Sequence, residues 1–354
     1  MKSKTGWLGW GALALASGLG ACDDAGVTDG LGGSASGGTA SGVGGLPAAG
    51  GTASGGAGTG GAAATGGAAT GGTTSVPPRE DGFALVWSDE FDGPSIDSSK
   101  WQHEVNCWGG GNNEQQCYVT AAKNSYIESG MLHVKAIADS PTGAIGGPGN
   151  DATQVTRPYS SARLRTAGKA DFKYGRFEAR IKLPQGQGMW PAFWMLPTAY
   201  AYGGWARSGE IDIMEAVNTS PSNNLVYGTL HYGAEWPANV HTGDSYDPSN
   251  YVAENFHVYA AEWEQGEIRW FVDDVHFETQ DDWYSTGNAF PAPFDQDFHI
   301  LLNLAVGGAW PGPPNDSTTF PQEMVVDYVR VYQCEAAPDT GIGCGTTDPS
   351  VTPL

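Results

Sequence analysis

The chain has 354 residues, and its 17 Lys and Arg stand against 39 Asp and Glu, so the formal net charge is −22. This balance argues against nucleic-acid binding, because phosphate recognition needs clusters of Lys and Arg that the sequence lacks. An acidic protein of this kind suits an uncharged ligand instead.

Residues 1–22 predict an export signal. Lys2 and Lys4 give it a positive start, and the apolar stretch at 7–19 is short and glycine-rich for a transmembrane helix. The stretch ends in Leu19-Gly20-Ala21-Cys22, which resembles a bacterial lipobox, and an ordinary secretory signal is the alternative. Because Cys22 is the odd one of five cysteines, we expect it to be lipidated. The protein would then be a membrane-anchored lipoprotein at the cell surface or in the periplasm, and otherwise secreted.

Residues 23–78 predict a flexible linker. The segment consists mostly of Gly, Ala, Ser and Thr, with few charges and no aromatic residue. Such a composition cannot bury enough apolar surface to offset the entropy lost on ordering. A random coil of this length spans on the order of 40 Å, so we expect a tether that holds a domain away from a surface.

Residues 79–334 predict one domain, which contains most of the aromatic residues. Short segments rich in β-branched and aromatic residues recur with turn signals between them, and none has a sustained helical period. The expected strands are 83–87, 132–136, 175–181, 258–263, 268–272, 300–304 and 325–332. The pattern predicts an all-β sandwich or barrel without a substantial helix, and a hairpin with Asp273-Asp274 at its turn.

Two further segments flank or interrupt these strands. The Gly- and Pro-rich stretch 138–158 predicts a long surface loop, and residues 335–354 predict a small tail stapled by a disulfide. Four cysteines allow three pairings, of which we favour the local one, Cys107 with Cys117 and Cys334 with Cys344. A zinc site is disfavoured because neither pair has the two-residue spacing of a metal knuckle.

The most informative motif is Glu210-Ile211-Asp212-Ile213-Met214-Glu215. In a strand, Glu210 and Asp212 share a face, while Glu215 would point to the opposite face. A β-bulge at Ile213-Met214 would bring all three acids to one side. Solvated acids or a Ca²⁺ cluster are alternatives. Glycoside hydrolysis with retention needs such a pair of carboxyls, about 5–5.5 Å apart.

The sequence around this motif resembles glycoside hydrolase family 16 across the whole domain. The resemblance rests on the segments 87–91, 174–184, 188–196, 209–215, 303–308 and 326–332. The branch that it resembles most is the bacterial laminarinases, which are endo-β-1,3-glucanases. It implies a jelly-roll sandwich of two antiparallel sheets with a concave substrate cleft. It also implies that Glu210 is the nucleophile, Asp212 its assistant and Glu215 the acid/base.

The same resemblance implies a set of sugar-binding residues. Indole rings pack on the apolar faces of pyranoses, although buried tryptophans are more often part of a core. The candidates are Trp190, Trp194, Trp205, Trp310, His231, Arg163, Asn303 and Asn112. Tyr232-Gly233 departs from the Gly-Pro that many laminarinases have after this histidine.

The family implies no cofactor for catalysis, but some members hold a structural Ca²⁺ away from the cleft. Glu90 and Gly130, through main-chain oxygens, and Asp327 fall at the matching positions. We expect a monomer that acts on β-glucan polysaccharide by double displacement. The alternatives are action on mixed-linkage glucan, agar or galactan, transglycosylation, and glucan binding without hydrolysis. The last is disfavoured because both glutamates are present.

Overall fold

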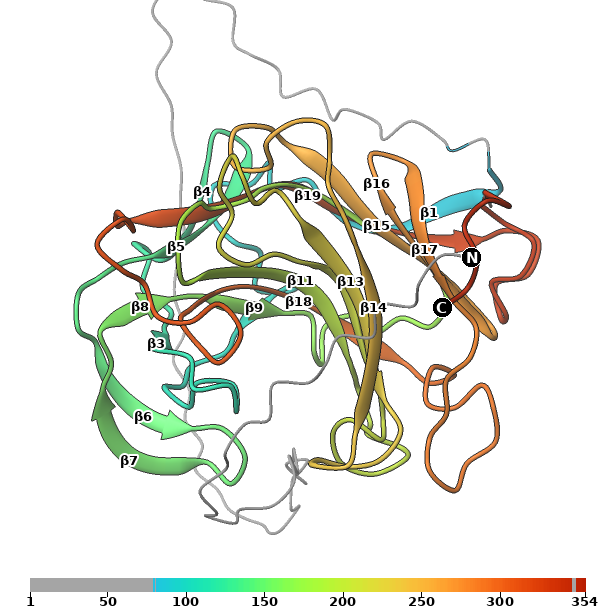
Figure 1. The fold of residues 1–354 in the computed structure, drawn as a ribbon, viewed down its shortest axis with the longest axis horizontal. Coiled ribbons are helices and arrows are strands. Elements are labelled where there is room, and N and C mark those ends of the chain that lie inside the picture. Colours follow the sequence, from blue (N-terminus) through green and yellow to red (C-terminus); the bar gives the residue numbers. More distant parts are fainter. Residues whose placement is uncertain (1–78, 80, 346–347) are drawn as a thin grey trace, which may run out of the picture. The chain divides into compact units, whose positions relative to one another are not determined.

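A computed structural model describes residues 79, 81–345 and 348–354. The predicted signal, the lipidation site Cys22 and the whole predicted linker, 23–78, lie outside these residues. In the described part every regular element is a β-strand, as predicted, and two large sheets hold most of the strands (Figure 1). No helix in these residues has the length and apolar character to cross a membrane.

Sheet A has eight strands, in the order β17-β16-β15-β10-β19-β5-β4, with β1 also paired with β19. All of its pairs are antiparallel. Its members are β1 (Phe83–Asp89), β4 (Ser125–Glu128), β5 (Met131–Ala136), β10 (Gly175–Lys182), β15 (His257–Glu264), β16 (Glu267–Val272), β17 (Val275–Gln280) and β19 (Gln322–Cys334). Six of the seven predicted strands lie in this sheet.

Sheet B has seven antiparallel strands, in the order β14-β13-β12-β11-β18-β9-β2. Its members are β2 (Gln102–His103), β9 (Arg163–Arg165), β11 (Met189–Pro197), β12 (Glu210–Glu215), β13 (Val226–Tyr232), β14 (Val240–Tyr246) and β18 (Phe298–Val306). The acidic motif is therefore a strand near the middle of this sheet.

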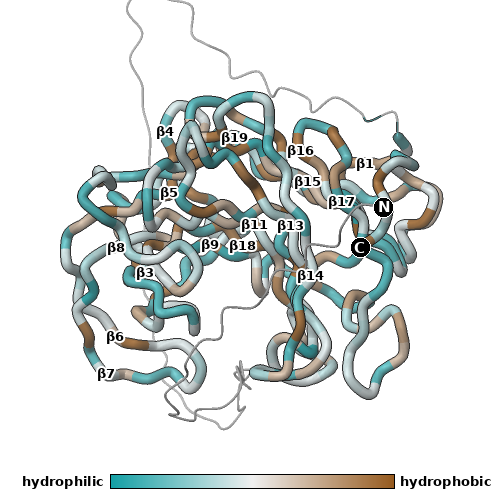
Figure 2. Tube along the Cα trace, viewed as in Figure 1, coloured by the Kyte–Doolittle hydropathy of each residue, from teal (hydrophilic) through white to brown (hydrophobic). Residues whose placement is uncertain are grey.

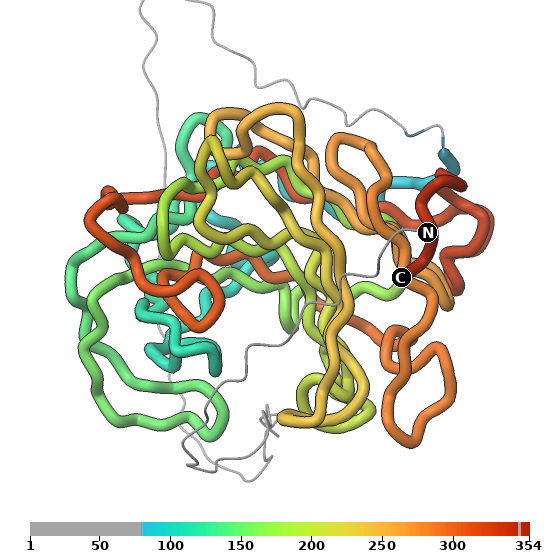
Figure 3. The backbone as a smooth tube through the Cα atoms, in the orientation of Figure 1, coloured from blue at the N-terminus to red at the C-terminus, as the bar shows by residue number. Residues whose placement is uncertain are grey.

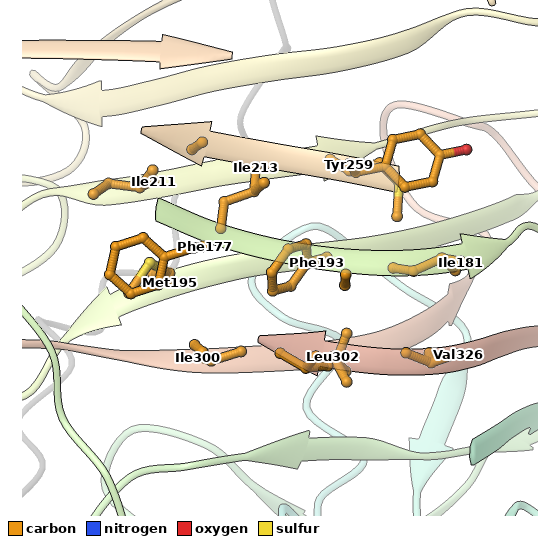
Figure 4. Packing of buried hydrophobic residues seen from close by; sticks show 14 of the residues in the cluster. Phe177, Ile181, Phe193, Met195, Ile211, Ile213, Tyr259, Ile300, Leu302 and Val326 are labelled. Carbon is orange, nitrogen blue, oxygen red and sulfur yellow. The ribbon is translucent and has the colours of Figure 1, made fainter. Parts of the chain in front are cut away.

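The main hydrophobic core contains inward-facing residues of both sheets. Figure 4 shows Phe177 and Ile181 of β10 in the same hydrophobic cluster as Phe193 of β11 and Leu302 of β18. Hydrophobic segments follow the strands of both sheets in Figure 2. Each such side chain contributes about 1.5–3 kcal/mol when it is fully buried. A core built from residues of both sheets confirms the predicted two-sheet sandwich.

The predicted hairpin between β16 and β17 is confirmed. Val272 pairs with Val275, and Asp273 and Asp274 form the two-residue turn with φ angles of 50° and 60°. Asp is one of the residues that tolerates this left-handed region, which a type I′ turn requires at both positions.

The prediction of a surface loop at 138–158 is wrong in part, because this segment contains its own hairpin. β6 (Thr142–Gly146) pairs with β7 (Asp151–Thr156). The hydroxyls of Thr142 and Thr156 lie 2.7 Å apart across this pair. The glycines that suggested a loop make the turn, where Gly146, Gly147 and Gly149 have positive φ. Next to the hairpin lies a small parallel pair, β3 (Gln116–Tyr118) with β8 (Tyr159–Ser161).

Both disulfides follow the local pairing that we favoured. Cys107 is bonded to Cys117 and Cys334 to Cys344. The second disulfide holds the start of the tail, which packs on sheet A: the Gln265 amide donates to the Thr340 carbonyl, and the Leu354 amide donates to the Thr279 carbonyl. The tail therefore covers part of sheet A, as a cap would.

Candidate active site

The three acids of β12 share one face because the strand contains the predicted bulge. Asp212 pairs with Thr229 and Glu215 with Tyr227, so β12 advances three residues while β13 advances two. The apolar residues of the strand, Ile211, Ile213 and Met214, are at most 2% exposed and belong to the core. Because they occupy the core face, the carboxylates point away from it.

Each of the two glutamates accepts a hydrogen bond from an indole. Trp205 Nε1 donates to Glu210 Oε2 at 2.8 Å, and Trp190 Nε1 donates to Glu215 Oε1 at 2.7 Å. These bonds orient the carboxyl groups without supplying a full positive charge. They leave the two glutamates free to differ in protonation.

Asp212 lies between the two glutamates along β12, and His231 of β13 lies beside Glu210 and Asp212. His231 Nε2 is 3.3 Å from Asp212 Oδ2 and 3.7 Å from Glu210 Oε1. Trp270, from sheet A, donates its indole N–H to the main-chain oxygen of Asp212 at 2.9 Å. The centre of β12 is thus held from below by the other sheet and from the side by β13.

The acids have strongly perturbed pKa values. Burial, followed by the charge of Asp212, raises the pKa of Glu210 to about 8 and that of Glu215 to about 8. Burial also raises the pKa of Asp212 well above its ordinary value. Because neighbouring carboxylates repel one another, these three groups titrate as a coupled set and not independently. The surroundings therefore favour the protonated form of both glutamates near neutral pH.

Trp190 and Trp194 lie on the same face of sheet B as the acids. They alternate along β11 with Met189, Phe193 and Met195, which are buried in the core. Trp194 Nε1 donates to Asn303 Oδ1 at 2.7 Å.

Two further predicted residues join this pair of tryptophans. The guanidinium of Arg163 lies 5.2 Å from the centre of the Trp194 ring. Trp310 stands edge-on to Trp190, with ring centres 5.4 Å apart, and is 40% exposed. Arg163 and Trp310 therefore contact the residues that β11 directs toward the acids.

Asn112 reaches the same region from the loop that the Cys107–Cys117 disulfide closes. Its main-chain oxygen accepts from the Ala309 amide at 2.8 Å. A Cβ atom at Gly308 would lie 3.3 Å both from that oxygen and from the Trp190 ring, so the loop abuts Trp190. Seven of the eight predicted sugar-binding residues are thus linked, directly or through one neighbour, to the acidic strand, and Asn112 is linked through Gly308 and Trp190.

Several residues of this region were not predicted. Tyr227 packs edge-on against Trp310 at 5.1 Å, and alternation along β13 from His231 could have revealed it. Glu114 is buried beneath Asn112, where it accepts from Gln116 at 2.6 Å. His241 of β14 pairs with His231 of β13, and their ring centres lie 5.4 Å apart. Its position depends on strand pairing, which leaves no local signal.

The residues of the expected calcium site come together at one stretch of β19. Asp89 pairs with Val329 and Leu132 with Val326, so Glu90 and the turn at Gly130 flank Asp327. Asp327 accepts from Arg180 at 2.6 Å. Arg330 donates to the Glu90 carboxylate, so the main-chain oxygen of Glu90 is the atom that would bind an ion. The donors here are all oxygens, the type that Ca²⁺ prefers.

The arrangement can carry out acid–base and nucleophilic chemistry with carboxyls alone. The group Glu210, Asp212 and His231 also has ligand atoms within 4.8 Å of one another, which would suit a metal ion. The flanking indoles and amides instead form a surface suited to an uncharged, ring-shaped ligand.

Comparison with known proteins identifies related sequences and folds. A family model described as "Beta-porphyranase A-D, GH16 domain" matches residues 85–334. The glucan endo-1,3-beta-glucosidase A1 of Niallia circulans is 42% identical over 276 residues, which cover 73% of this chain and 39% of that protein. The beta-glucanase of Rhodothermus marinus is 43% identical over 264 residues, covering 70% of this chain and 85% of that protein.

A solved structure has the same fold. The laminarinase from Rhodothermus marinus superposes with a TM-score of 0.62 at 40% sequence identity, covering 72% of this chain and 98% of that one. The range matched by the family model, 85–334, includes the bulged acidic strand β12 described above.

Proposed function

The chain belongs to glycoside hydrolase family 16, and from this premise we propose that it is a retaining endo-β-1,3-glucanase acting on laminarin-like glucan. Its two sheets form the jelly-roll sandwich of the family. One observation carries the proposal: the bulge in β12 places Glu210, Asp212 and Glu215 on one face, with an indole on each glutamate.

In the first step Glu215 gives its proton to the glycosidic oxygen while ionised Glu210 attacks the anomeric carbon. The bond from that carbon to the departing oxygen breaks, and a covalent glycosyl–enzyme ester forms. In the second step Glu215, now ionised, takes a proton from water, and the hydroxide oxygen displaces Glu210. Configuration is retained because the carbon is inverted twice, and both glutamates return to their starting states.

The surrounding side chains position these two groups. Asp212 and His231 adjust how the protons are shared, because their charges act on both glutamates. Trp190, Trp194 and Trp310 offer ring faces and edges to the sugars, while Asn303, Arg163 and Asn112 offer polar groups around them. The reaction needs no cofactor, since every group that it uses belongs to the chain.

The nature of the glycan is the point that most needs testing. The relatives are named for action on glucan, whereas the family model is named for porphyranases. We propose β-1,3-glucan because the glucanases share 42–43% identity with this chain over at least 264 residues. Transglycosylation would use the same intermediate, with a sugar in place of water.

The test is to incubate the protein with laminarin, lichenan, agarose, porphyran and xyloglucan and to measure new reducing ends. Glu215→Gln is the control, since it keeps the shape of the side chain but cannot exchange a proton. We expect release from laminarin by the wild type alone, and proton NMR should show the β-anomer first. Release only from porphyran or agarose would overturn the glucanase assignment, and no release from any glycan by a folded protein would favour a binding role.

We further propose that a lipid at Cys22 anchors the exported protein and that residues 23–78 tether the catalytic domain, 79–334, to the membrane. The support is the lipobox-like sequence and the composition of the linker. Cys22→Ser should move the protein from the membrane fraction to the soluble exported fraction. Retention of the variant in the membrane would contradict the anchor. We also propose a monomer, which light scattering would test.

Calcium is the last proposal about this fold. The main-chain oxygens of Glu90 and Gly130 and the second carboxylate oxygen of Asp327 would bind the ion and tie the first strand to the last. We expect the melting temperature to rise in millimolar Ca²⁺ relative to EDTA. Asp327→Asn should abolish the difference while glucan hydrolysis continues. Identical melting with and without Ca²⁺ would contradict the site.

A further inference from the structure

Trp236 is the most exposed large hydrophobic residue in the part of the chain that the structure describes. Its exposed fraction is 70%, and among the described tryptophans only Trp310, at 40%, is also exposed. Trp101, Trp263 and Trp270 are at most 2% exposed, as is usual for this residue. An indole left in water forgoes a large gain from burial, so its position calls for an explanation.

The exposure of Trp236 does not come from a loosely held loop. The turn between β13 and β14 that carries it is bonded to neighbouring segments through Gly233 and Glu235. The Gly233 amide donates to the Tyr284 carbonyl, and the Thr286 amide donates to the Gly233 carbonyl. Glu235 Oε1 accepts from the Gly204 amide at 3.0 Å. The indole is thus presented by a fixed backbone.

The same turn is bonded directly to the segment that holds Glu210. The Trp236 amide donates to the Trp205 carbonyl at 2.9 Å. The Trp205 indole in turn donates to Glu210 and lies 5.5 Å from the His231 ring. Trp236 is therefore one hydrogen bond away from the aromatic residue that contacts the nucleophile.

The Glu215 side of the acids has an equivalent arrangement. Trp190 donates to Glu215, and the exposed Trp310 packs against Trp190. Each glutamate is thus bonded to a partly buried tryptophan, beside which an exposed tryptophan lies. The proposed function makes Trp310 a sugar-binding residue. Trp236 is its counterpart on the Glu210 side, and its exposed indole can bind a sugar in the same way.

We propose that Trp236 is a further sugar-binding residue, which extends the glucan-binding surface beyond Trp205 on the Glu210 side. Its ligand is a β-1,3-linked glucose unit of the same chain that Glu210 and Glu215 cleave, outside the pair of sugars at the reacting bond. The apolar face of a glucose ring stacks on the indole. This inference rests on the proposed function, because it takes the substrate from there.

The test measures binding by the full chain in the cleavage-deficient Glu215→Gln background. Titration calorimetry with β-1,3-gluco-oligosaccharides of three to eight units gives affinity as a function of length. We expect Trp236→Ala to weaken binding of the longest oligosaccharides about tenfold, or about 1.4 kcal/mol. For the trisaccharide, which is too short to extend past Trp205, the expected change is less than twofold.

Two matched variants separate stacking from structural damage. Trp236→Tyr retains a ring face and should keep most of the affinity. Phe290→Ala removes another exposed aromatic residue, which packs on Trp283 and lies next to Gly266 between β15 and β16, and it should bind all lengths normally. In the active enzyme, Trp236→Ala should raise KM for laminarin far more than it lowers kcat.

The outcomes distinguish this inference from the proposed function. Normal binding of all lengths by Trp236→Ala would overturn the inference and leave the glucanase assignment intact. An equal loss for short and long oligosaccharides would show that Trp205 had been disturbed, and would also overturn it. If the parent binds no β-1,3-oligosaccharide of any length, the proposed function itself fails.

Discussion

At the scale of single residues, the protein keeps three carboxyl groups in surroundings that disfavour their charge. A carboxyl whose pKa is higher in the folded than in the unfolded state binds more protons when folded. The free energy of unfolding therefore falls as pH rises from the unfolded pKa near 4.5 to the folded value of about 8. Below pH 4.5 the carboxyl is protonated in both states, so it no longer lowers the free energy of unfolding. The active site thus weakens the fold most at alkaline pH.

The first prediction uses this window. Glu215→Gln removes a titrating carboxyl while preserving its volume and an acceptor oxygen for Trp190. We expect the variant to melt several degrees above the wild type at pH 8.5, since about 1 kcal/mol corresponds to 2–4 °C in a domain of this size. The difference should shrink toward pH 4.5. Calorimetry across this range would check it, and a difference independent of pH would contradict it.

The second prediction concerns Asp212. Its charge raises the pKa values of both glutamates, so its removal lowers them. Glu215 would then lose its proton at lower pH, and Asp212→Asn should move the alkaline limb of kcat/KM to lower pH. Because the contact with His231 is also changed, we expect a rate loss of about 10–100-fold. A pH profile with an unmoved alkaline limb would show that Asp212 does not tune the acid/base.

At the scale of elements, the β6–β7 hairpin supports the loop that carries Asn112. The Cys107 amide donates to the carbonyls of Ala144 and Ile145, each at 3.0 Å, and Arg157 donates to the Cys107 carbonyl. A Cβ at Gly147 would lie 2.6 Å from the Trp108 ring, so the hairpin turn packs directly on the loop. Hairpin and disulfide together fix the loop that abuts Trp190 beside the candidate active site.

The third prediction tests the effect of the Cys107–Cys117 loop on substrate binding. Replacing Cys107 and Cys117 by serine should raise KM for laminarin several-fold with a smaller change in kcat, because Asn112 loses its fixed position. The stability lost should be about 2–3 kcal/mol, as expected for a short disulfide loop. Serine at Cys334 and Cys344 is the control: it should lower the melting temperature without raising KM. Equal effects on KM from both pairs would contradict a local role.

At the scale of the whole molecule, the tail closes over buried charges of sheet A. Arg176 pairs with Glu262 at 3.0 Å, and both side chains are 1% exposed. Arg269, also buried, donates to the Cys344 carbonyl. A Cβ at Gly345 would lie 2.2 Å from Glu262 Oε2, so the tail backbone rests on this carboxylate. Buried pairs of this kind are costly to leave incomplete.

The fourth prediction follows from this cover. A chain that ends at residue 334 loses the second disulfide and exposes the ion pairs to water. We expect its melting temperature to fall by roughly 5–10 °C, which corresponds to about 2–3 kcal/mol at 2–4 °C per kcal/mol. The three acids lie on β12 of sheet B, so kcat of the folded protein at 25 °C should be unchanged. Loss of hydrolysis with unchanged melting would contradict this separation.

Features with a local cause were open to prediction from the sequence. Alternation with a period of two predicted strands such as 175–181 and 325–332, and the spacing of the three acids predicted the bulge that the third acid requires. Asp273-Asp274 between two apolar runs indicated its hairpin. The resemblance to family 16 supplied the roles of the acids, which spacing alone would not have separated.

Other features depended on residues far apart in the sequence. The strands of 138–158 were hidden by glycines that serve only the turn, and the pairing of β14 with β13, which brings His241 to His231, has no local signal. Sequence by itself determined which residues bear the chemistry, because strand periodicity and turn preferences act between near neighbours. Tertiary structure alone decided what those residues contact, including Trp236 beside Trp205 and the tail over Glu262. These contacts form by sheet pairing and packing between segments far apart in the sequence, which local preferences do not determine.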